Sequence, residues 1–110
     1  DLVEKEQNSD PSWFGFMLLV NEKAKFSRNE ISTFLEKHNI QTRTLFAGNI
    51  IRHPAFDCMK EGLDFKVIGK LENTEKIMNN GFWVGVYPGM SFEMIDYIIL
   101  KIKEFCEVNK

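Results

Sequence analysis

The chain has 110 residues, 44% of them hydrophobic and 27% charged, with a formal net charge of -2 at pH 7. This length suits one domain with one core, since a chain of this size hides somewhat over roughly 60% of its unfolded surface. Lysines and arginines are scattered among acids rather than gathered into a basic stripe, which argues against nucleic acid as a partner. No apolar run reaches the roughly 18 to 20 residues that span a bilayer, and no signal-peptide pattern occurs, so we expect a cytoplasmic protein.

The first eleven residues are polar and end at Pro11. Such a stretch is typical of a linker or a frayed arm, so we expect residues 1–11 to lie outside the core and residues 12–110 to form the domain. The absence of an initial Met suggests that the domain was cut from a longer protein at a flexible joint.

The first predicted strand is the apolar run SWFGFMLLV, residues 12–20. Its length and aromatic content predict a strand that is buried on both faces, and Gly15 within it invites close approach by another group. Ser27 and Glu30 then have capping-box spacing, which predicts the start of a helix that ends near Asn39. One face of that helix would carry Ile31, Phe34, Leu35 and His38, with His38 as a residue favoured at the helix end.

Further strands are expected over residues 41–46 and 82–87. Between them, a short helix would be capped by Asn73 or Thr74 and closed by Gly81. Ser91 is expected to cap a last helix, one face of which would be core. That face holds Met94, Ile95, Ile98, Ile99, Ile102 and Phe105. This order predicts an α+β fold, a small and mostly antiparallel sheet with helices on one face.

The stretch TRTLFAGNIIRHPAF, residues 42–56, places polar groups among apolar ones. Arg43 and Arg52 could converge on an anion, because a guanidinium matches a carboxylate or phosphate; surface ion pairing is the alternative. Gly48 and Asn49 favour a tight turn, with a ligand contact from Asn49 as a second possibility. His53 should be extended because Pro54 follows it. No Ser, Cys or paired carboxylate completes a catalytic unit with these residues.

The two cysteines, Cys58 and Cys106, lie far apart and have neither C-x-x-C spacing nor a neighbouring His in a zinc pattern. We therefore expect two reduced, packed thiols and no metal site.

Three stretches resemble the C-terminal segment of nucleotide-sugar 3-dehydrases of the DegT/DnrJ/EryC1/StrS aminotransferase-like family. They are SWFGFMLLV, TRTLFAGNIIRHPAF and NTEKIMNNGFWVGVYPGMSFEMIDYI, in the same order and with similar spacing. The type most resembled removes the C3 hydroxyl of a CDP-4-keto-6-deoxyhexose in O-antigen lipopolysaccharide biosynthesis. The resemblance runs from Trp13 to Phe105.

The resemblance implies the small C-terminal domain of a fold type I pyridoxal-phosphate enzyme. Members bind pyridoxamine phosphate and use a His, in place of the usual Lys, to abstract a proton as the C3 hydroxyl leaves. That His, the groups that bind the cofactor and, in one branch, the cysteines of an iron–sulfur cluster belong to the large domain. The resemblance thus implies no catalytic residue and no metal ligand in this chain, so the isolated chain should be inactive.

The family's TR-x-LF-x-GN falls on residues 42–49, and its R-x-P falls on Arg52 and Pro54. His53 stands where the family commonly has Gln, and Thr44 replaces an apolar residue. The resemblance implies that Arg43, Asn49, Arg52 and His53 form a cleft rim facing the nucleotide sugar, with apolar neighbours that anchor it. It also implies a homodimer when full-length and, in the iron–sulfur branch, a reductase partner. A small-molecule-binding or regulatory module, or a dimerisation module, would give a similar composition.

Overall fold

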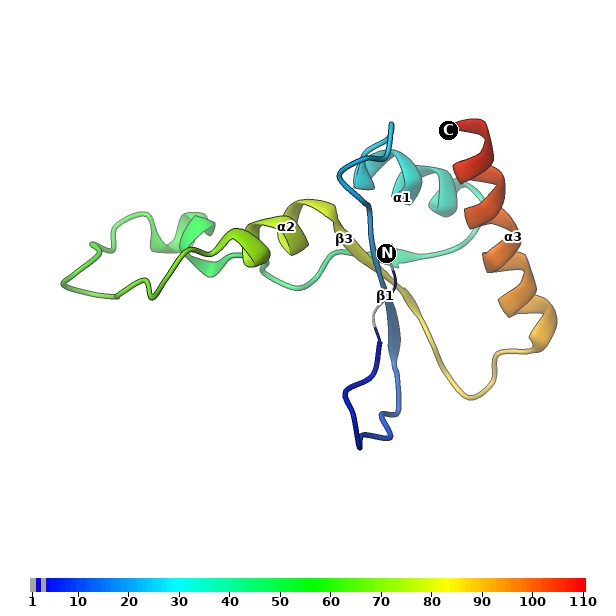
Figure 1. The fold of residues 1–110 in the computed structure, drawn as a ribbon, viewed down its shortest axis with the longest axis horizontal. Helices are drawn as coiled ribbons and strands as arrows, with labels where there is room; N and C mark the ends of the chain where they lie inside the picture. The colour runs from blue at the N-terminus through cyan, green and yellow to red at the C-terminus, as the bar shows by residue number, and fades with distance from the viewer. Residues whose placement is uncertain (1, 3) are drawn as a thin grey trace.

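Three strands and three α-helices occur in the part of the chain that the computed structural model describes, residue 2 and residues 4–110 (Figure 1). The elements are β1 (Gly15–Leu19), α1 (Arg28–Lys37), β2 (Thr42–Arg43), the 3-10 helices η1 (Ile50–Arg52) and η2 (Pro54–Phe56), α2 (Glu72–Asn80), β3 (Gly81–Gly85) and α3 (Phe92–Val108). This is the predicted order, with the two 3-10 helices added.

The sheet is antiparallel, with β3 between β1 and β2. Leu18 pairs with Phe82, and Thr42 pairs with Val84, so their side chains share one face. α1 and α3 pack on that face, which confirms the predicted α+β architecture. The buried hydrophobic residues are Val20, Ile31, Leu35, Ile40, Phe82, Val84 and Phe105.

The strands are shorter and less buried than predicted. β1 is half-buried rather than buried on both faces, because the helices cover only one side of the sheet. β2 ends at Arg43 because the chain turns away directly afterwards. Phe46 has a φ of 39°, and the Gly48 N–H donates to the Leu45 carbonyl at 2.9 Å.

Two of the three predicted helix caps are present. The Ser27–Glu30 capping box is complete, and the Ser91 hydroxyl accepts from the Met94 N–H. The prediction of Asn73 or Thr74 as a cap was wrong, because α2 begins earlier, after Leu71, with no side-chain cap. Gly81 closes α2 as expected.

The apolar face of α3 is only partly core, which corrects the prediction. Phe105 is buried, and Ile98 and Ile102 pack against the core. Ile95 and Ile99 remain 38% and 44% exposed. They line a groove of about 600 Å³ between α3 and the sheet, because the three strands are too few to cover the full width of the helix face.

Residues 44–80 form an arm that extends from the body, the body being the sheet with α1 and α3 (Figure 1). The chain measures 53 × 35 × 25 Å and has a radius of gyration of 16.7 Å. A compact domain of this length would have about 13 Å. The arm accounts for the difference.

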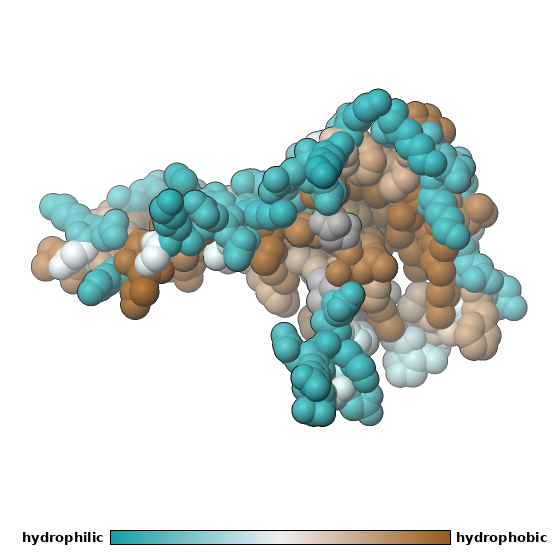
Figure 2. Space-filling model, viewed as in Figure 1, coloured by the Kyte–Doolittle hydropathy of each residue, from teal (hydrophilic) through white to brown (hydrophobic). Residues whose placement is uncertain are grey.

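The segment before Pro11 is mostly exposed where the structure describes it, and it touches the sheet at one position. Leu2 forms an isolated antiparallel bridge with Leu18. Figure 2 shows polar residues over this segment and along one side of the arm, and apolar residues gathered over the body. Among the described residues, no helix has the length and apolar character needed to cross a bilayer.

Candidate functional site

The four residues predicted to form the rim lie in two different places. Arg43 belongs to β2 in the body, whereas Asn49, Arg52 and His53 lie in or next to the 3-10 helices of the arm. Arg43 and Arg52 line separate hollows, so in this chain they do not converge on one anion.

Arg43 borders a hollow of about 620 Å³, most of whose lining comes from the helix side of the sheet, including Val84 and Ile98. It pairs with Trp83 across β2 and β3, and both residues face away from α1 and α3. Trp83 Nε1 donates to the Thr44 carbonyl at 3.2 Å, and Tyr97 from α3 also lines the hollow. Within the part of the chain described, the exposed Arg43 side chain has no hydrogen bond or ion pair, so its guanidinium is available to an outside anion.

Asn49 is a buried polar residue, only 2% exposed. Its Nδ2 donates to Glu75 Oε1 at 2.6 Å, and its Oδ1 accepts from the Ile51 N–H at 3.3 Å, which caps η1. Its backbone N–H donates to the Met78 sulfur at 3.3 Å. The preceding Gly48 has a φ of 64°, as expected for a tight turn.

Arg52 pairs with the same carboxylate oxygen, with Nε 3.0 Å from Glu75 Oε1. The hydrogen bond from Arg52, and then that from Asn49, lowers the pKa of Glu75 below its ordinary value. Ion pairing, the alternative kept open for Arg52, is therefore present. The Arg52 side chain remains 68% exposed, so its other N–H groups face solvent.

His53 joins η1 to η2 and has the expected extended backbone, with φ -79° and ψ 127°. Its Nδ1 accepts from the Ala55 N–H at 3.3 Å, which caps η2. Its ring lies 6.0 Å from that of Phe56. The imidazole is thus held by its own turn, and the residue is exposed. His38 bonds its Nδ1 to the Phe34 carbonyl at 2.8 Å, which confirms its helix-end position.

The apolar residues of this stretch anchor it less than expected, with only Leu45 and Phe56 half-buried among its large apolar side chains. Phe46 is 75% exposed and Ile50 is 57% exposed. The arm extends beyond the body, so these side chains have no core to enter. Contacts of Asn49 and Arg52 with α2 hold the segment instead.

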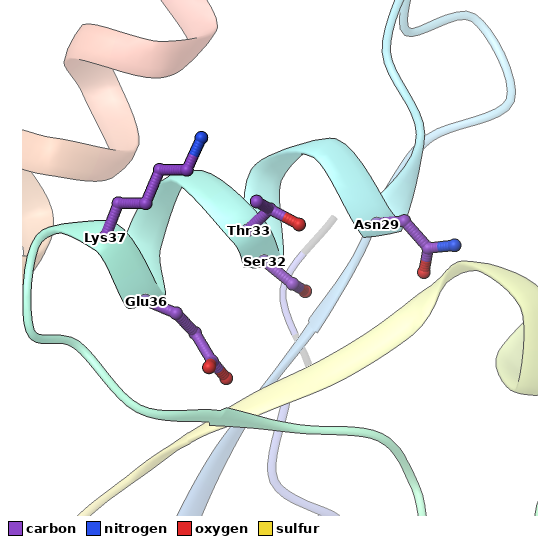
Figure 3. A pocket seen from close by; sticks show the side chains of 5 residues that line it. All are labelled: Asn29, Ser32, Thr33, Glu36 and Lys37. Atoms are coloured by element: carbon purple, nitrogen blue, oxygen red, sulfur yellow. The ribbon is translucent and has the colours of Figure 1, made fainter.

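Another hollow, lined by polar residues and about 490 Å³ in volume, lies along α1 (Figure 3). In Figure 3, Ser32 and Glu36 point toward the sheet, whereas Lys37 points to the opposite side of the helix. Glu36 Oε1 accepts from the Thr42 hydroxyl at 2.9 Å and from the Thr42 N–H at 3.2 Å. Because Glu36 holds the start of β2, we assign this hollow a structural role.

Sequence reasoning missed Glu75 and Trp83. Glu75 lies in a stretch read only as a connecting helix, and its contacts with Asn49 and Arg52 are made across the arm. No short sequence pattern predicts a contact between residues so far apart in the chain. Trp83 carried a better signal, because a glycine in a neighbouring strand, here Gly15 two positions before the Trp83 partner Met17, leaves room for a large ring.

Both cysteines are free, as predicted. Cys58 is exposed, so the prediction of a packed thiol was wrong there; it lies in the arm, where no core is at hand. Cys106 is half-buried. Among the described residues, no group of three His, Cys, Asp or Glu side chains is placed to hold a metal ion.

Comparison with known proteins places this chain beside sugar-modifying enzymes. It is 45% identical over 109 residues to the lipopolysaccharide biosynthesis protein RfbH of Salmonella typhimurium, covering 99% of this chain and 24% of that protein. It is 46% identical over 98 residues to a dTDP-4-dehydro-2,6-dideoxy-D-glucose 3-dehydratase of Saccharopolyspora spinosa, covering 89% of this chain and 20% of that enzyme. A GDP-4-keto-6-deoxy-D-mannose 3-dehydratase of Escherichia coli is 27% identical over 94 residues, 86% of this chain and 24% of that enzyme.

A solved structure has the same fold. It is a GDP-4-keto-6-deoxymannose-3-dehydratase with a trapped PLP-glutamate geminal diamine, with a TM-score of 0.75 and 23% identity over 88% of this chain and 24% of that one. The chain thus spans about a quarter of the length of these relatives, in their C-terminal part. The family model described as the DegT/DnrJ/EryC1/StrS aminotransferase family matches residues 2–103. The chain belongs to that family.

Proposed function

We propose that this chain is the C-terminal small domain of a pyridoxamine- or pyridoxal-phosphate-dependent nucleotide-sugar 3-dehydratase that acts in lipopolysaccharide biosynthesis. The observation that carries the proposal is 45% identity along nearly the whole chain to a lipopolysaccharide biosynthesis protein, together with 46% identity to a 3-dehydratase. The exposed apolar face of α3 also supports a domain that packs against more polypeptide.

The proposed substrate is a CDP-4-keto-6-deoxyhexose, from which the complete enzyme removes the C3 hydroxyl. The complete enzyme would be a cytoplasmic homodimer. The relatives whose substrates are named act on dTDP- and GDP-linked sugars, so the nucleotide is what an experiment has to decide. Turnover of CDP-, GDP- and dTDP-4-keto-6-deoxy sugars by the complete enzyme should favour CDP. Preference for another nucleotide would correct the substrate and leave the reaction class intact.

The residues described here do not fit the cofactor itself. The hollow that Arg43 borders has no second cation among the described residues and includes the acid Glu93, and that around Arg52 mixes Arg52 and Lys70 with several acids. Neither combines a phosphate cradle with a proton-transferring group, so we assign the cofactor to the part of the enzyme outside this chain. An iron–sulfur cluster and its reductase partner, in the branch that has them, would likewise be held outside these residues.

The contribution of this chain is to bind and orient the substrate. Arg43 would bind phosphate or sugar oxygens through its available guanidinium, Arg52 would offer its remaining N–H groups, and His53 its Nε2. Asn49 belongs to the same rim, but its burial means that it acts from behind, by holding the segment.

The Arg43→Ala variant of the complete enzyme tests this role. Losing one charge-assisted hydrogen bond that is equally strong in ground and transition states should raise KM and lower kcat/KM by about 10- to 150-fold with kcat nearly unchanged. Lys37→Ala, on the outer side of α1, is the matched loss of an exposed cation and should leave both constants unchanged. Wild-type kinetics in Arg43→Ala would remove Arg43 from the binding site.

A second experiment tests whether the chain is only part of the enzyme. The 110-residue chain, given pyridoxamine phosphate and the three sugar nucleotides, should form no 3-deoxy product. Turnover by this chain alone would overturn the assignment of the catalytic groups to other parts of the enzyme.

A further inference from the structure

One carboxylate oxygen joins two residues of the rim segment to α2. Glu75 Oε1 accepts from Asn49 Nδ2 at 2.6 Å and from Arg52 Nε at 3.0 Å. The Glu75 side chain is 30% exposed, whereas Asn49 is 2% exposed. The carboxylate therefore lies at the border between the packed inside of the arm and solvent, where a hydrogen bond to a charged acceptor is stronger than a neutral one.

Further contacts, besides those of Glu75, restrict the position of the segment around Asn49. A Cβ at Gly48 would collide with the Met78 side chain, and the Asn49 N–H donates to the Met78 sulfur. Met78 lies one helical turn after Glu75, so both contacts fix the segment to the same face of α2. Residues 48 and 49 are thereby held at two points.

Only one nitrogen of the Arg52 guanidinium has a partner among the described residues. Its Nε is taken by Glu75, while its exposed side chain leaves the remaining N–H groups free to meet a ligand. A guanidinium fixed in this way has lost part of its rotamer freedom before any ligand arrives, which lowers the entropic cost of binding. His53 follows directly, and its N–H donates to the Ile50 carbonyl at 3.1 Å within η1.

We propose that Glu75 is a positioning residue, which holds residues 49–53 on α2 and fixes the guanidinium of Arg52 for the substrate. The hold on the segment stands on the contacts alone, and the link to the substrate rests on the proposed function. Glu75 touches no substrate itself; it acts through Asn49 and Arg52.

Hydrogen exchange in the 110-residue chain tests the hold. The N–H groups of Arg52 and His53 are bonded within η1, to the Asn49 and Ile50 carbonyls. In Glu75→Ala they should exchange roughly tenfold faster or more, while amides of α1 and α3 keep their rates. Glu75→Gln keeps an acceptor without the charge and should fall between. The matched control is Glu72→Ala, an exposed acid of the same helix, 3.8 Å from Lys70, which should change nothing at residues 52 and 53. Unchanged exchange in Glu75→Ala would overturn the proposal.

Kinetics of the complete enzyme test the link to the substrate. Glu75→Ala should raise KM at nearly constant kcat, and Glu75→Gln should raise it less. Global destabilisation would instead lower the active fraction, and hence kcat, together with Tm.

Because Glu75 acts partly through Arg52, the double variant with Arg52→Ala should raise KM less than the two single effects combined. Fully multiplicative effects, or an unchanged KM despite faster exchange, would overturn the positioning role. A wild-type enzyme without 3-dehydratase activity would refute the proposed function, and the exchange experiment would still decide the hold on the segment.

Discussion

The indole ring of Trp83 lies directly over Gly15, so close that a Cβ built on Gly15 would be 2.6 Å from Trp83 Cε3. Phe14 adds an edge-to-face contact with the same indole, with ring centroids 5.4 Å apart. The ring thereby covers β1 on the face of the sheet that α1 and α3 leave open.

Gly15→Ala should destabilise the chain, because the new methyl group would displace the Trp83 indole, which contacts Phe14 and donates to the Thr44 carbonyl. Overpacking of this kind typically costs about 1 to 3 kcal/mol. Urea unfolding, followed by tryptophan fluorescence, measures the effect. Gly85 is paired with Gly15, and a Cβ there meets no atom within 4 Å, so Gly85→Ala is the matched control and should change stability far less. Equal losses in both variants would show that the Trp83 contact is not the cause.

The core around α1 gives a second prediction. Leu35 is fully buried, whereas Leu100 on α3 is 58% exposed. Leu35→Ala should cost about 2 to 5 kcal/mol, through lost burial and the cavity it leaves. Leu100→Ala, the same change in another helix, should stay within about 0.5 kcal/mol. Thermal unfolding of the two variants checks this, and similar melting temperatures would contradict the assigned core.

Acid should loosen the arm. The hydrogen bonds from Arg52 and Asn49 lower the pKa of Glu75 below its ordinary value of 4.5. A group whose pKa is lowered by folding stabilises the fold above its unfolded pKa, and that contribution disappears as the pH falls through the lower, folded pKa. The pKa values of Glu30, Glu93 and Glu104 are lowered too, so global stability will also fall in acid.

A local probe separates these effects. The NMR signal of Arg52 Nε–H should shift as the pH falls below 4.5, and the shift should vanish in Glu75→Gln. A shift of equal size in that variant would assign the titration to another group.

The two thiols should differ in reactivity. Cys58 is exposed and Cys106 is half-buried, so iodoacetamide should modify Cys58 first. Mass spectrometry of the partly labelled chain measures the ratio, and Cys58→Ser should leave only the slow reaction. Equal rates would mean that the end of α3 opens readily.

The sequence allowed prediction of the elements whose signals are local. The Ser27–Glu30 box and Ser91 each marked a helix start, because a cap depends on residues within one turn. Burial was predicted less well. The continuous apolar run of β1 suggested burial on both faces, and the apolar stripe of α3 suggested one fully buried face. Within this chain one face of the sheet and part of that α3 stripe stay open.

The candidate site was predictable only in part. Arg43 could be placed on a strand from the sequence, and the structure shows it there and exposed. That it binds an anion stays a prediction. The burial of Asn49 and its bond to Glu75 could not be predicted, because the two residues meet only after α2 has folded back along the arm. The Asn49 side chain, for which the sequence left a ligand contact possible, is buried and donates to Glu75.

The geometry of the arm has a consequence for the evolution of this domain. The arm leaves the sheet after Arg43 and returns at β3, where Arg43 pairs with Trp83, so its two ends meet on neighbouring strands. The entropic cost of closing a loop changes by only about 0.6 kcal/mol for each doubling of its length. Insertions and deletions between the 3-10 helices and α2 should therefore change the stability of the body little. The length of that segment can therefore vary while Trp83 and the strands around it continue to fold as before.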